Sequence, residues 1–160
     1  IFQVEKDGMI HVWEPFSNRF EGRFQVSRNL YKNVYGNKIV FEEINHDLEL
    51  TFRYQWNSSN TFGFIKKSKL INNGSAETRI SVLDGIQNVL PYGVESYTQT
   101  NSSNLVDAYK RTELEPETGL GIFALSAIIV DKAEPSEALK ATTVWSIGHK
   151  NKTVLLNRAN

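Results

Sequence analysis

The residues best suited to chemistry lie in one short stretch, "SVLDGIQNVLPYGVESY", at positions 81–97. Its polar and aromatic members, set around two glycines and a proline, are Asp84, Gln87, Asn88 and Tyr92. Carboxylate and amide groups can bind ligand hydroxyls, and an aromatic ring can stack on the apolar face of a ligand. The same residue types also build tight turns, because Asp and Asn hydrogen-bond to nearby backbone. The stretch is therefore either a ligand site or a structural turn stabilised by hydrogen bonds.

We predict different roles for these four residues. Asp84 is an acid flanked by apolar residues at the end of a predicted strand, which is typical of an Asx turn or of a cap on the short segment that follows. We therefore expect Asp84 and Asn88 mainly to organise the turn by hydrogen bonds to backbone. Gln87 and Tyr92 are expected to face a partner or ligand, since Tyr92 sits in a Pro-Gly turn.

Aromatic side chains form a second set of candidates, because flat rings on a β-sandwich can stack on the apolar faces of sugars. The rings that could form such a platform are Trp13, Trp56, Trp145, Tyr92 and Tyr97. Trp56 shares a predicted strand face with Leu50 and Phe52, which favours a place in the core. It remains a candidate for ligand binding or docking, together with Gln87 and Tyr92.

Patterns that would support catalysis are weak. The three histidines, His11, His46 and His149, lie far apart and in no metal-binding spacing. No serine lies in a nucleophile-elbow motif, and no glycine-rich loop has the order that a phosphate site requires. Glu42 and Glu43 fall on opposite faces of a predicted strand, which argues against a paired action in glycoside hydrolysis. We therefore assign no catalytic residue, no metal site and no cofactor.

Composition excludes several classes of partner. Lysine and arginine total 18, as do aspartate and glutamate, so the formal net charge is zero and no basic face for nucleic acid is expected. The longest apolar run, at 120–130, is too short to cross a bilayer, so no membrane insertion is expected. The chain has no cysteine, which removes disulfides and thiolate chemistry but leaves the compartment open.

The periodicity predicts an all-β fold. Residues 48–56, "LELTFRYQW", alternate apolar and polar side chains over nine positions, as a half-buried strand does. Short turn-rich connections join about eight or nine such segments, which predicts an antiparallel β-sandwich. Residues 94–114 form the one helical excursion, with Ser102 or Ser103 as a possible cap.

Individual segments carry more specific expectations. Alternation over 20–26 predicts a strand, and residues 45–47 form a hairpin loop with His46 exposed. Asn73-Gly74 indicates a further hairpin. Residues 120–130 are expected to form a strand buried on both faces. Further strands are expected at 38–44, 140–147 and 152–156.

The chain is expected to form a single β-sandwich domain across residues 1–160. It begins with Ile1 and shows no signal-peptide pattern. We therefore interpret it as a processed chain or as a piece of a longer, multidomain protein.

The order of motifs over residues 38–150 resembles a known family. "NHDLELTFRYQWNSSNTFGFIKKSKLINNG", followed by "ISVLDGIQNVLPYG", is similar to the N-terminal, galactose-mutarotase-like β-supersandwich domain of large carbohydrate-active proteins. The relatives implied are cellobiose-phosphorylase-type glycoside phosphorylases and related bacterial proteins. In those enzymes the catalytic acid lies in a following (α/α)6 barrel, so the resemblance carries no catalytic residue onto this chain. The histidine and glutamate pattern of true mutarotases is not matched either.

Three functions follow as hypotheses. The first is a non-catalytic accessory domain of a carbohydrate-active enzyme, which packs against a catalytic domain and contacts glycan. The second is a freestanding carbohydrate-binding module, and the third is a small mutarotase-type epimerase. The partner is therefore expected to be a carbohydrate or an adjoining catalytic domain, and this chain alone is not expected to be an enzyme.

Overall fold

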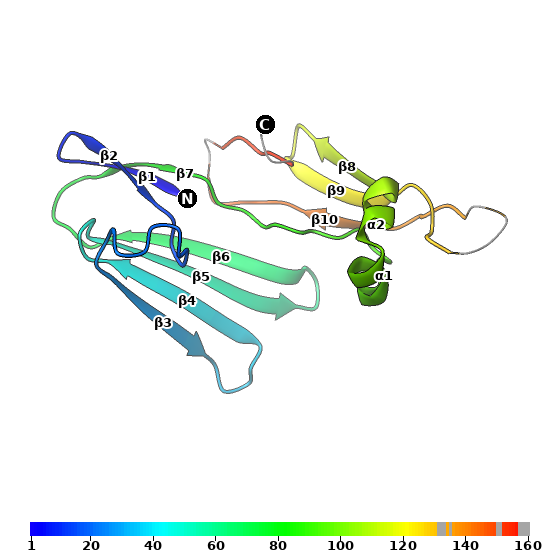
Figure 1. Ribbon diagram of the computed structural model, residues 1–160, viewed down its shortest axis with the longest axis horizontal. Coiled ribbons are helices and arrows are strands. Elements are labelled where there is room, and N and C mark those ends of the chain that lie inside the picture. Colours follow the sequence, from blue (N-terminus) through cyan, green and yellow to red (C-terminus); the bar gives the residue numbers. More distant parts are fainter. Residues whose placement is uncertain (131–133, 135, 150–151, 157–160) are drawn as a thin grey trace. The chain divides into compact units, whose positions relative to one another are not determined.

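The structure is a computed structural model that describes residues 1–130, 134, 136–149 and 152–156. Over these residues it contains three antiparallel sheets and two short helices (Figure 1). The predicted all-β antiparallel sandwich with one small helical excursion is confirmed. The excursion is shorter than the expected 94–114, because the helices end at Tyr109 and residues 110–114 belong to a strand.

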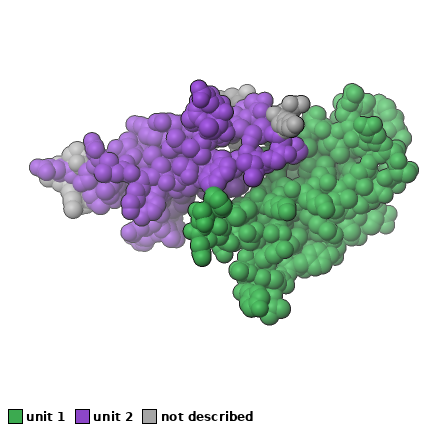
Figure 2. All heavy atoms as spheres, turned by 180° about the vertical axis from the view of Figure 1, so that it is seen from behind, with its two compact units in different colours: residues 1–85 green, residues 86–160 purple. Residues whose placement is uncertain are grey.

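The chain divides into two compact units, residues 1–85 and 86–160 (Figure 2). Each unit is described by itself. The boundary falls between Gly85 and Ile86, inside the stretch at 81–97 that carries the candidate residues. The expectation of a single domain across residues 1–160 stays a prediction.

The first unit contains a small sheet with the order β2-β1-β7. Its strands are β1 (Phe2–Lys6), β2 (Met9–Trp13) and β7 (Arg79–Val82). Asp7 and Gly8 join β1 to β2, with φ of 53° and 72° respectively. Two successive left-handed residues match the right-handed twist of a two-residue hairpin, and Asp-Gly is a preferred pair for that turn.

The second sheet of this unit has the order β3-β4-β5-β6. Its strands are β3 (Val26–Lys32), β4 (Lys38–Asn45), β5 (Leu50–Ser59) and β6 (Gly63–Asn72), and each pairs with the next in sequence. In the segment 48–56, Leu50 and Phe52 are buried and Arg53 is exposed, as the predicted alternation requires, but Thr51 on the outer face is buried as well. The expected turn after β4 is also present, and His46 is exposed.

The core of the first unit lies between its two sheets (Figure 1). Its buried apolar side chains are Phe2, Val4, Trp13, Leu48, Leu50 and Phe52. The Phe2 ring lies 5.3 Å from that of Trp13 and 5.0 Å from that of Phe52, measured between centroids, so it contacts both layers. Burial of each such side chain stabilises the fold by about 1.5–3 kcal/mol.

A buried carboxylate joins the two sheets beside this core. Glu43 lies opposite Phe52 in the sheet register and therefore faces inward, where it is 2% exposed. Its Oε1 accepts a hydrogen bond from Trp13 Nε1 at 2.8 Å, and its Oε2 accepts from Phe16 N at 2.7 Å and Arg28 Nε at 2.8 Å. One side chain on β4 thus holds the end of β2, the segment after it and the neighbouring strand β3.

The second unit consists of α1 (Ser96–Asn101), α2 (Ser103–Tyr109) and a sheet of order β10-β9-β8. The strands are β8 (Lys110–Glu115), β9 (Leu120–Leu125) and β10 (Ala141–Val144). Its buried apolar side chains include Val106, Phe123 and Leu125. Ser102 occupies the N-cap position of α2, but its side chain makes no capping hydrogen bond.

Two predictions for the first unit, one strand and one hairpin, are wrong. Residues 20–24 form turns, because Glu21 N and Arg23 N bond to carbonyls three residues back and Gly22 has a φ of 77°, so the strand begins only at Val26. Asn73-Gly74 does not close a hairpin either. It carries the chain from β6 in one sheet toward β7 in the other, and β7 pairs with β1.

Three strands predicted in the second unit also differ. The segment at 120–130 leaves its sheet after Leu125, and its burial alternates along the strand where burial on both faces was expected. The strand expected at 140–147 is shorter and ends at Val144. Residues 152–156 form no strand, although the Val154 and Leu156 side chains lie beside Gly119 and Gly121.

We expect the replacement Glu43→Ala to lower the free energy of unfolding by about 3 kcal/mol or more, because it leaves the Trp13 and Phe16 donors unpaired and Arg28 without its partner. Urea denaturation measures the change. Glu5→Ala is the matched control, since Glu5 is exposed and lies 3.8 Å from Arg79, a pair worth at most about 1 kcal/mol. Equal losses in the two variants would contradict a structural role for Glu43.

Candidate functional site

The stretch at 81–97 is divided between the two units. Asp84 belongs to the first unit, whereas Gln87, Asn88 and Tyr92 belong to the second. The four residues are therefore described in two groups, each within its own unit. Asp84 is described below with its neighbours in the first unit, and the other three are described with theirs.

Asp84 ties the chain beyond β7 to β6 in the opposing sheet. Its Oδ2 accepts a hydrogen bond from Ser68 Oγ at 2.6 Å, and its Oδ1 accepts from Gly85 N at 2.9 Å and from Lys66 Nζ. The Lys66 ammonium also donates to the Gly85 carbonyl oxygen at 2.9 Å. The predicted bond to backbone is present, but two of the three donors are side chains of another strand.

These contacts set the ionisation of Asp84. Partial burial alone would raise its pKa, but the hydrogen bonds from Lys66 and Ser68, the charge of Lys66 and the Gly85 N–H outweigh it and lower the pKa. The carboxylate is therefore charged at neutral pH. A charged carboxylate of this kind can hold two segments of chain together or form a polar contact. It cannot act as a general acid, because a general acid must carry a proton.

Trp56 lies on the same side of the sheet as this tie. It pairs with Lys66 on β6, and it shares its strand face with Tyr54 and the buried Phe52. Trp56 is only half-buried, so it lies at the margin of the core. The Lys66 ammonium, 5.7 Å from the centroid of the Tyr54 ring, connects these aromatic residues to Asp84.

Four rings form what we call the aromatic face: Phe16, Phe41, Tyr54 and Trp56. Tyr54 stacks on Phe41 with centroids 4.7 Å apart, and Phe16 meets Tyr54 edge-on at 5.3 Å. Burial raises the pKa of the Tyr54 hydroxyl, so this group stays neutral and able to donate a hydrogen bond. Half-buried rings beside the Lys66–Asp84 ion pair can bind a ligand that has both an apolar face and hydroxyl groups.

The remaining candidates lie on the surface of the second unit. Tyr92 is 54% exposed, as expected for a ring in a Pro-Gly turn, and the Lys140 ammonium lies 5.0 Å from its centroid. Gln87 is exposed. Asn88 has a φ of 58°, and among the described residues its side chain forms no hydrogen bond. Asn88 therefore shapes the turn by adopting a left-handed backbone, which Asn tolerates better than most residues.

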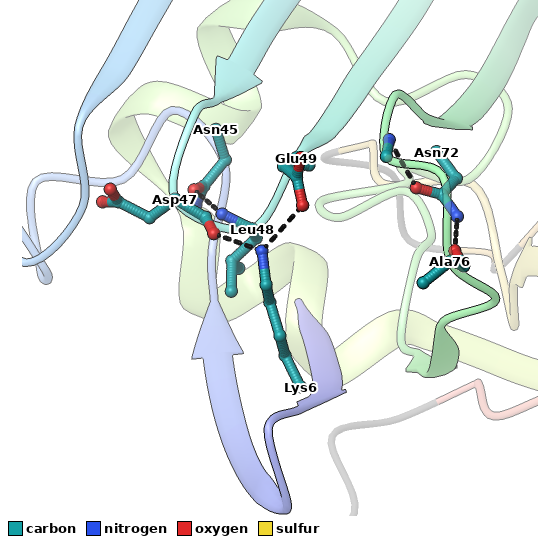
Figure 3. Close-up of polar contacts among 8 residues, drawn as sticks. Lys6, Asn45, Asp47, Leu48, Glu49, Asn72 and Ala76 are labelled. Carbon is teal, nitrogen blue, oxygen red and sulfur yellow. Dashed lines mark hydrogen bonds and ion pairs between the residues drawn. The ribbon is translucent and has the colours of Figure 1, made fainter.

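A polar cluster at the other end of the first unit is structural (Figure 3). The Lys6 ammonium bonds to the Asp47 carbonyl oxygen at 2.8 Å and to Glu49 Oε2 at 3.0 Å, and so ties β1 to the β4–β5 turn. The buried Asn45 side chain accepts from Leu48 N at 2.9 Å within that turn. Glu49 has a φ of 55°, which the hydrogen-bonded turn around it sustains. Within the cluster, the Nδ2 atom of Asn45 is buried and has no hydrogen-bond partner among the described residues.

A second polar network, on the outer face of the four-stranded sheet, was not foreseen. Glu42 is buried beneath Asn29, Tyr31 and Arg53, which all donate to its carboxylate. Burial opposes ionisation of Glu42, but these hydrogen bonds outweigh it and lower the pKa. The hydrogen bond to Glu42 in turn raises the pKa of the Tyr31 hydroxyl. The network crosses three strands and therefore holds the sheet together.

Within the described part of the chain no three histidine, aspartate or glutamate side chains gather closely enough to hold a metal ion. No helix among the described residues has the length and apolar character needed to cross a membrane. Comparison with known protein families and with curated proteins gave no match.

Sequence reasoning missed the residues that surround Asp84 and Trp56. Lys66, Ser68 and Tyr54 carry no recognisable motif, and Lys66 and Ser68 lie 18 and 16 residues from Asp84. The signal that could have found them is the hairpin between β5 and β6. Its register places Ser68 opposite Tyr54 and Lys66 opposite Trp56, on one face.

We expect Asp84→Ala to lower the free energy of unfolding by about 1 kcal/mol or more, because three hydrogen bonds to its carboxylate are lost. Asp84→Asn keeps a similar shape without the charge. Because folding lowers the pKa of Asp84, its contribution is complete above the unfolded pKa of about 4 and is lost as the pH falls through the folded value. The stability difference between wild type and Asp84→Asn should therefore be largest at neutral pH and shrink in acid. A stability difference that does not change with pH would contradict a stabilising role for the charged Asp84 carboxylate.

The left-handed backbone at Asn88 gives a separate test. Asn88→Gly should leave stability nearly unchanged, whereas Asn88→Val should cost about 1–2 kcal/mol, because a β-branched residue tolerates this φ poorly. Gln87→Val at the exposed neighbour is the control and should change stability by less than about 0.5 kcal/mol. If thermal denaturation shows Asn88→Gly to be as harmful as Asn88→Val, the side chain itself is essential.

Proposed function

We propose that this chain acts as a non-catalytic β-sandwich domain of a carbohydrate-active protein, and that it docks against an adjoining catalytic domain. The observation that carries the proposal is a group of large apolar side chains exposed at one end of the four-stranded sheet. We call this region, residues 30–38 and 59–64, the hairpin end.

The register explains why the two turns of the hairpin end lie together. Strands β3 and β5 both run antiparallel to β4, so the turn after β3 and the turn after β5 leave the sheet at the same end (Figure 1). The most exposed apolar residues there are Leu30 at 61%, Val34 at 99%, Tyr35 at 89% and Phe64 at 82%. Large apolar side chains exposed at one end of a sheet favour a protein interface there.

Charge defines the chemistry of the partner. Residues 22–41 and 50–76, which include the hairpin end, contain no aspartate or glutamate, and the acids of β4, Glu42 and Glu43, lie outside these ranges. The same ranges contain Lys32, Lys38 and Lys67. We infer that the partner domain presents apolar residues within an acidic rim, because opposite charges favour the correct orientation of docking.

A freestanding carbohydrate-binding module is the second candidate, and the aromatic face favours it. Tyr54 and Trp56 are half-buried rings next to the Lys66–Asp84 pair, which offers donors and acceptors to sugar hydroxyls. The mutarotase alternative gains no such support, since among the described residues no histidine lies within hydrogen-bond reach of a carboxylate.

Hydrogen exchange on the natural polypeptide tests the docking proposal. If that polypeptide continues into a catalytic domain, amides of the hairpin end should exchange more slowly there than in the isolated 160-residue chain. The double variant Val34→Asp/Phe64→Asp should remove this protection, because it places charge in the interface.

Met9→Asp/Ile10→Asp is the matched control, since both side chains are exposed and lie on the β1–β2 hairpin. Equal exchange at the hairpin end in the two forms of the protein would contradict docking. A natural polypeptide of the same length as this chain would instead favour the module, which a screen of glycans by tryptophan fluorescence then tests.

A further inference from the structure

Strand β3 is an exposed edge strand without a bulge or a proline. Within the part of the chain that the structure describes, β4 is its one neighbour in the sheet (Figure 1), and every residue of Val26–Lys32 is exposed. Its pairing with β4 is continuous over all seven residues. Proteins commonly protect such edges with bulges, prolines, a covering segment or charged side chains. In β3 the protection comes from charge, which leaves the edge open to a partner of opposite charge.

The hydrogen bonds at the two ends of β3 show which of its backbone groups are unpaired. His46 N donates to the Gln25 carbonyl oxygen at 2.9 Å, and Asn33 N donates to the Lys38 carbonyl oxygen at 3.2 Å. In an antiparallel ladder, residues 25, 27, 29, 31 and 33 therefore direct their backbone groups toward β4. The N–H and C=O groups of residues 26, 28, 30 and 32 point away from β4. An extended peptide laid along the edge can pair with them.

The same alternation determines which side chains border an added strand. Leu30 pairs with Phe41 and therefore lies on the side of the sheet that carries the aromatic face. Its alternate neighbours on that side are Val26, Arg28 and Lys32. Val26 is 36% exposed and Leu30 is 61% exposed, so an apolar side chain of an added strand can cover each of them.

The charge at one end of β3 indicates which partner fits. Arg28 is already paired with Glu43 at 2.8 Å, whereas Lys32 and Lys38 form no ion pair with any described residue. Lys32 ends β3 and Lys38 begins β4, so both lie at the same end of the sheet. An acidic side chain on the partner would face these cations. A second copy of this chain cannot supply it from its own edge strands, because β3 and β6 contain no acid.

The opposite edge of the sheet, β6, is less suited to this role. Lys66 and Ser68 on β6 both bond to Asp84, and the Lys66 ammonium bonds to the Gly85 carbonyl oxygen at 2.9 Å. The chain that follows β7 is thus held against β6. On β3 the contact with a preceding segment is made by Arg28, whose Nη2 bonds to the Ser17 carbonyl oxygen at 3.1 Å, so the half of the strand that ends at Lys32 stays accessible.

We propose that β3 binds an extended acidic peptide, which adds to the sheet as an antiparallel strand. An acidic side chain of the peptide lies beside Lys32, and an apolar side chain two residues further along lies beside Leu30. The proposal goes beyond docking at the hairpin end, because it depends on the backbone of a strand. Either could fail without the other, since Val26 and Arg28 lie outside the hairpin end and Phe64 lies outside β3.

The test is a titration of the 160-residue chain into the fluorescently labelled peptide Glu-Glu-Thr-Val-Thr-Thr-Thr-Val, followed by fluorescence anisotropy. With the second glutamate beside Lys32, the even-numbered peptide residues direct their N–H groups at β3. We therefore expect saturable binding of the unmodified peptide. N-methylation at positions 4 and 6 should weaken binding at least tenfold more than N-methylation at positions 3 and 5.

Charge reversal tests the pairing with Lys32. Lys32→Glu should weaken binding of the glutamate peptide at least tenfold and strengthen binding of a peptide with lysine at positions 1 and 2. Lys69→Glu is the matched control, because Lys69 is an exposed lysine on the opposite edge strand and its replacement changes the net charge equally. This variant should bind the glutamate peptide as the wild type does. A circular dichroism spectrum identical to that of the wild type verifies that each variant is folded.

Three results would each overturn the proposal. They are the absence of saturable binding, equal binding of the two methylated peptides, and an equal or larger loss in Lys69→Glu than in Lys32→Glu. Because the titration uses the 160-residue chain alone, its outcome does not depend on whether the natural polypeptide continues into a catalytic domain. Failure of strand addition and failure of docking are therefore distinguishable.

Discussion

The first unit depends on the carboxylate of Glu43, which is buried beside its apolar core. Glu43 lies among apolar rings, and burying an ionised carboxylate is tolerable only where donors surround it. Its three donors come from β2, from the segment after β2 and from β3, so satisfying one charge fixes three pieces of chain. The hydrophobic contacts between Phe2, Trp13 and Phe52 are non-directional. The carboxylate supplies the direction, because hydrogen bonds to it require one relative placement of the sheets.

Asp84 repeats this arrangement on the opposite flank of the core. Glu43 extends from the four-stranded sheet toward β2, whereas Asp84 extends from the end of β7 toward β6. The two sheets are therefore joined by one carboxylate from each layer. Between these two ties lies the aromatic face, whose rings continue the core outward from Phe52 through Tyr54. The position of Trp56 follows from this arrangement, since it is the next residue along the same face.

Much of the fold could be predicted from the sequence, and the misses have physical causes. Alternation predicted β5 because a second layer buries Leu50 and Phe52 on its inner face, while Arg53 on its outer face is exposed. The same alternation at 20–26 failed, because Gly22 and local turn bonds override a short apolar pattern. The candidate site was harder. Asp84 was recognised as a tie, but Lys66 and Ser68 reach it only through the register of a distant hairpin, which no local pattern encodes.

The lysines and arginines of the four-stranded sheet have a further consequence at its borders. Within the described residues β3 and β6 are the edge strands of that sheet, and each leaves one row of backbone donors and acceptors unpaired. Arg28 and Lys32 lie on β3, and Lys66, Lys67 and Lys69 lie on β6, with no acid on either strand. Two copies that approached edge to edge would bring like charges together. Repulsion between these like charges therefore opposes the addition of a strand from a second molecule of this chain at either edge.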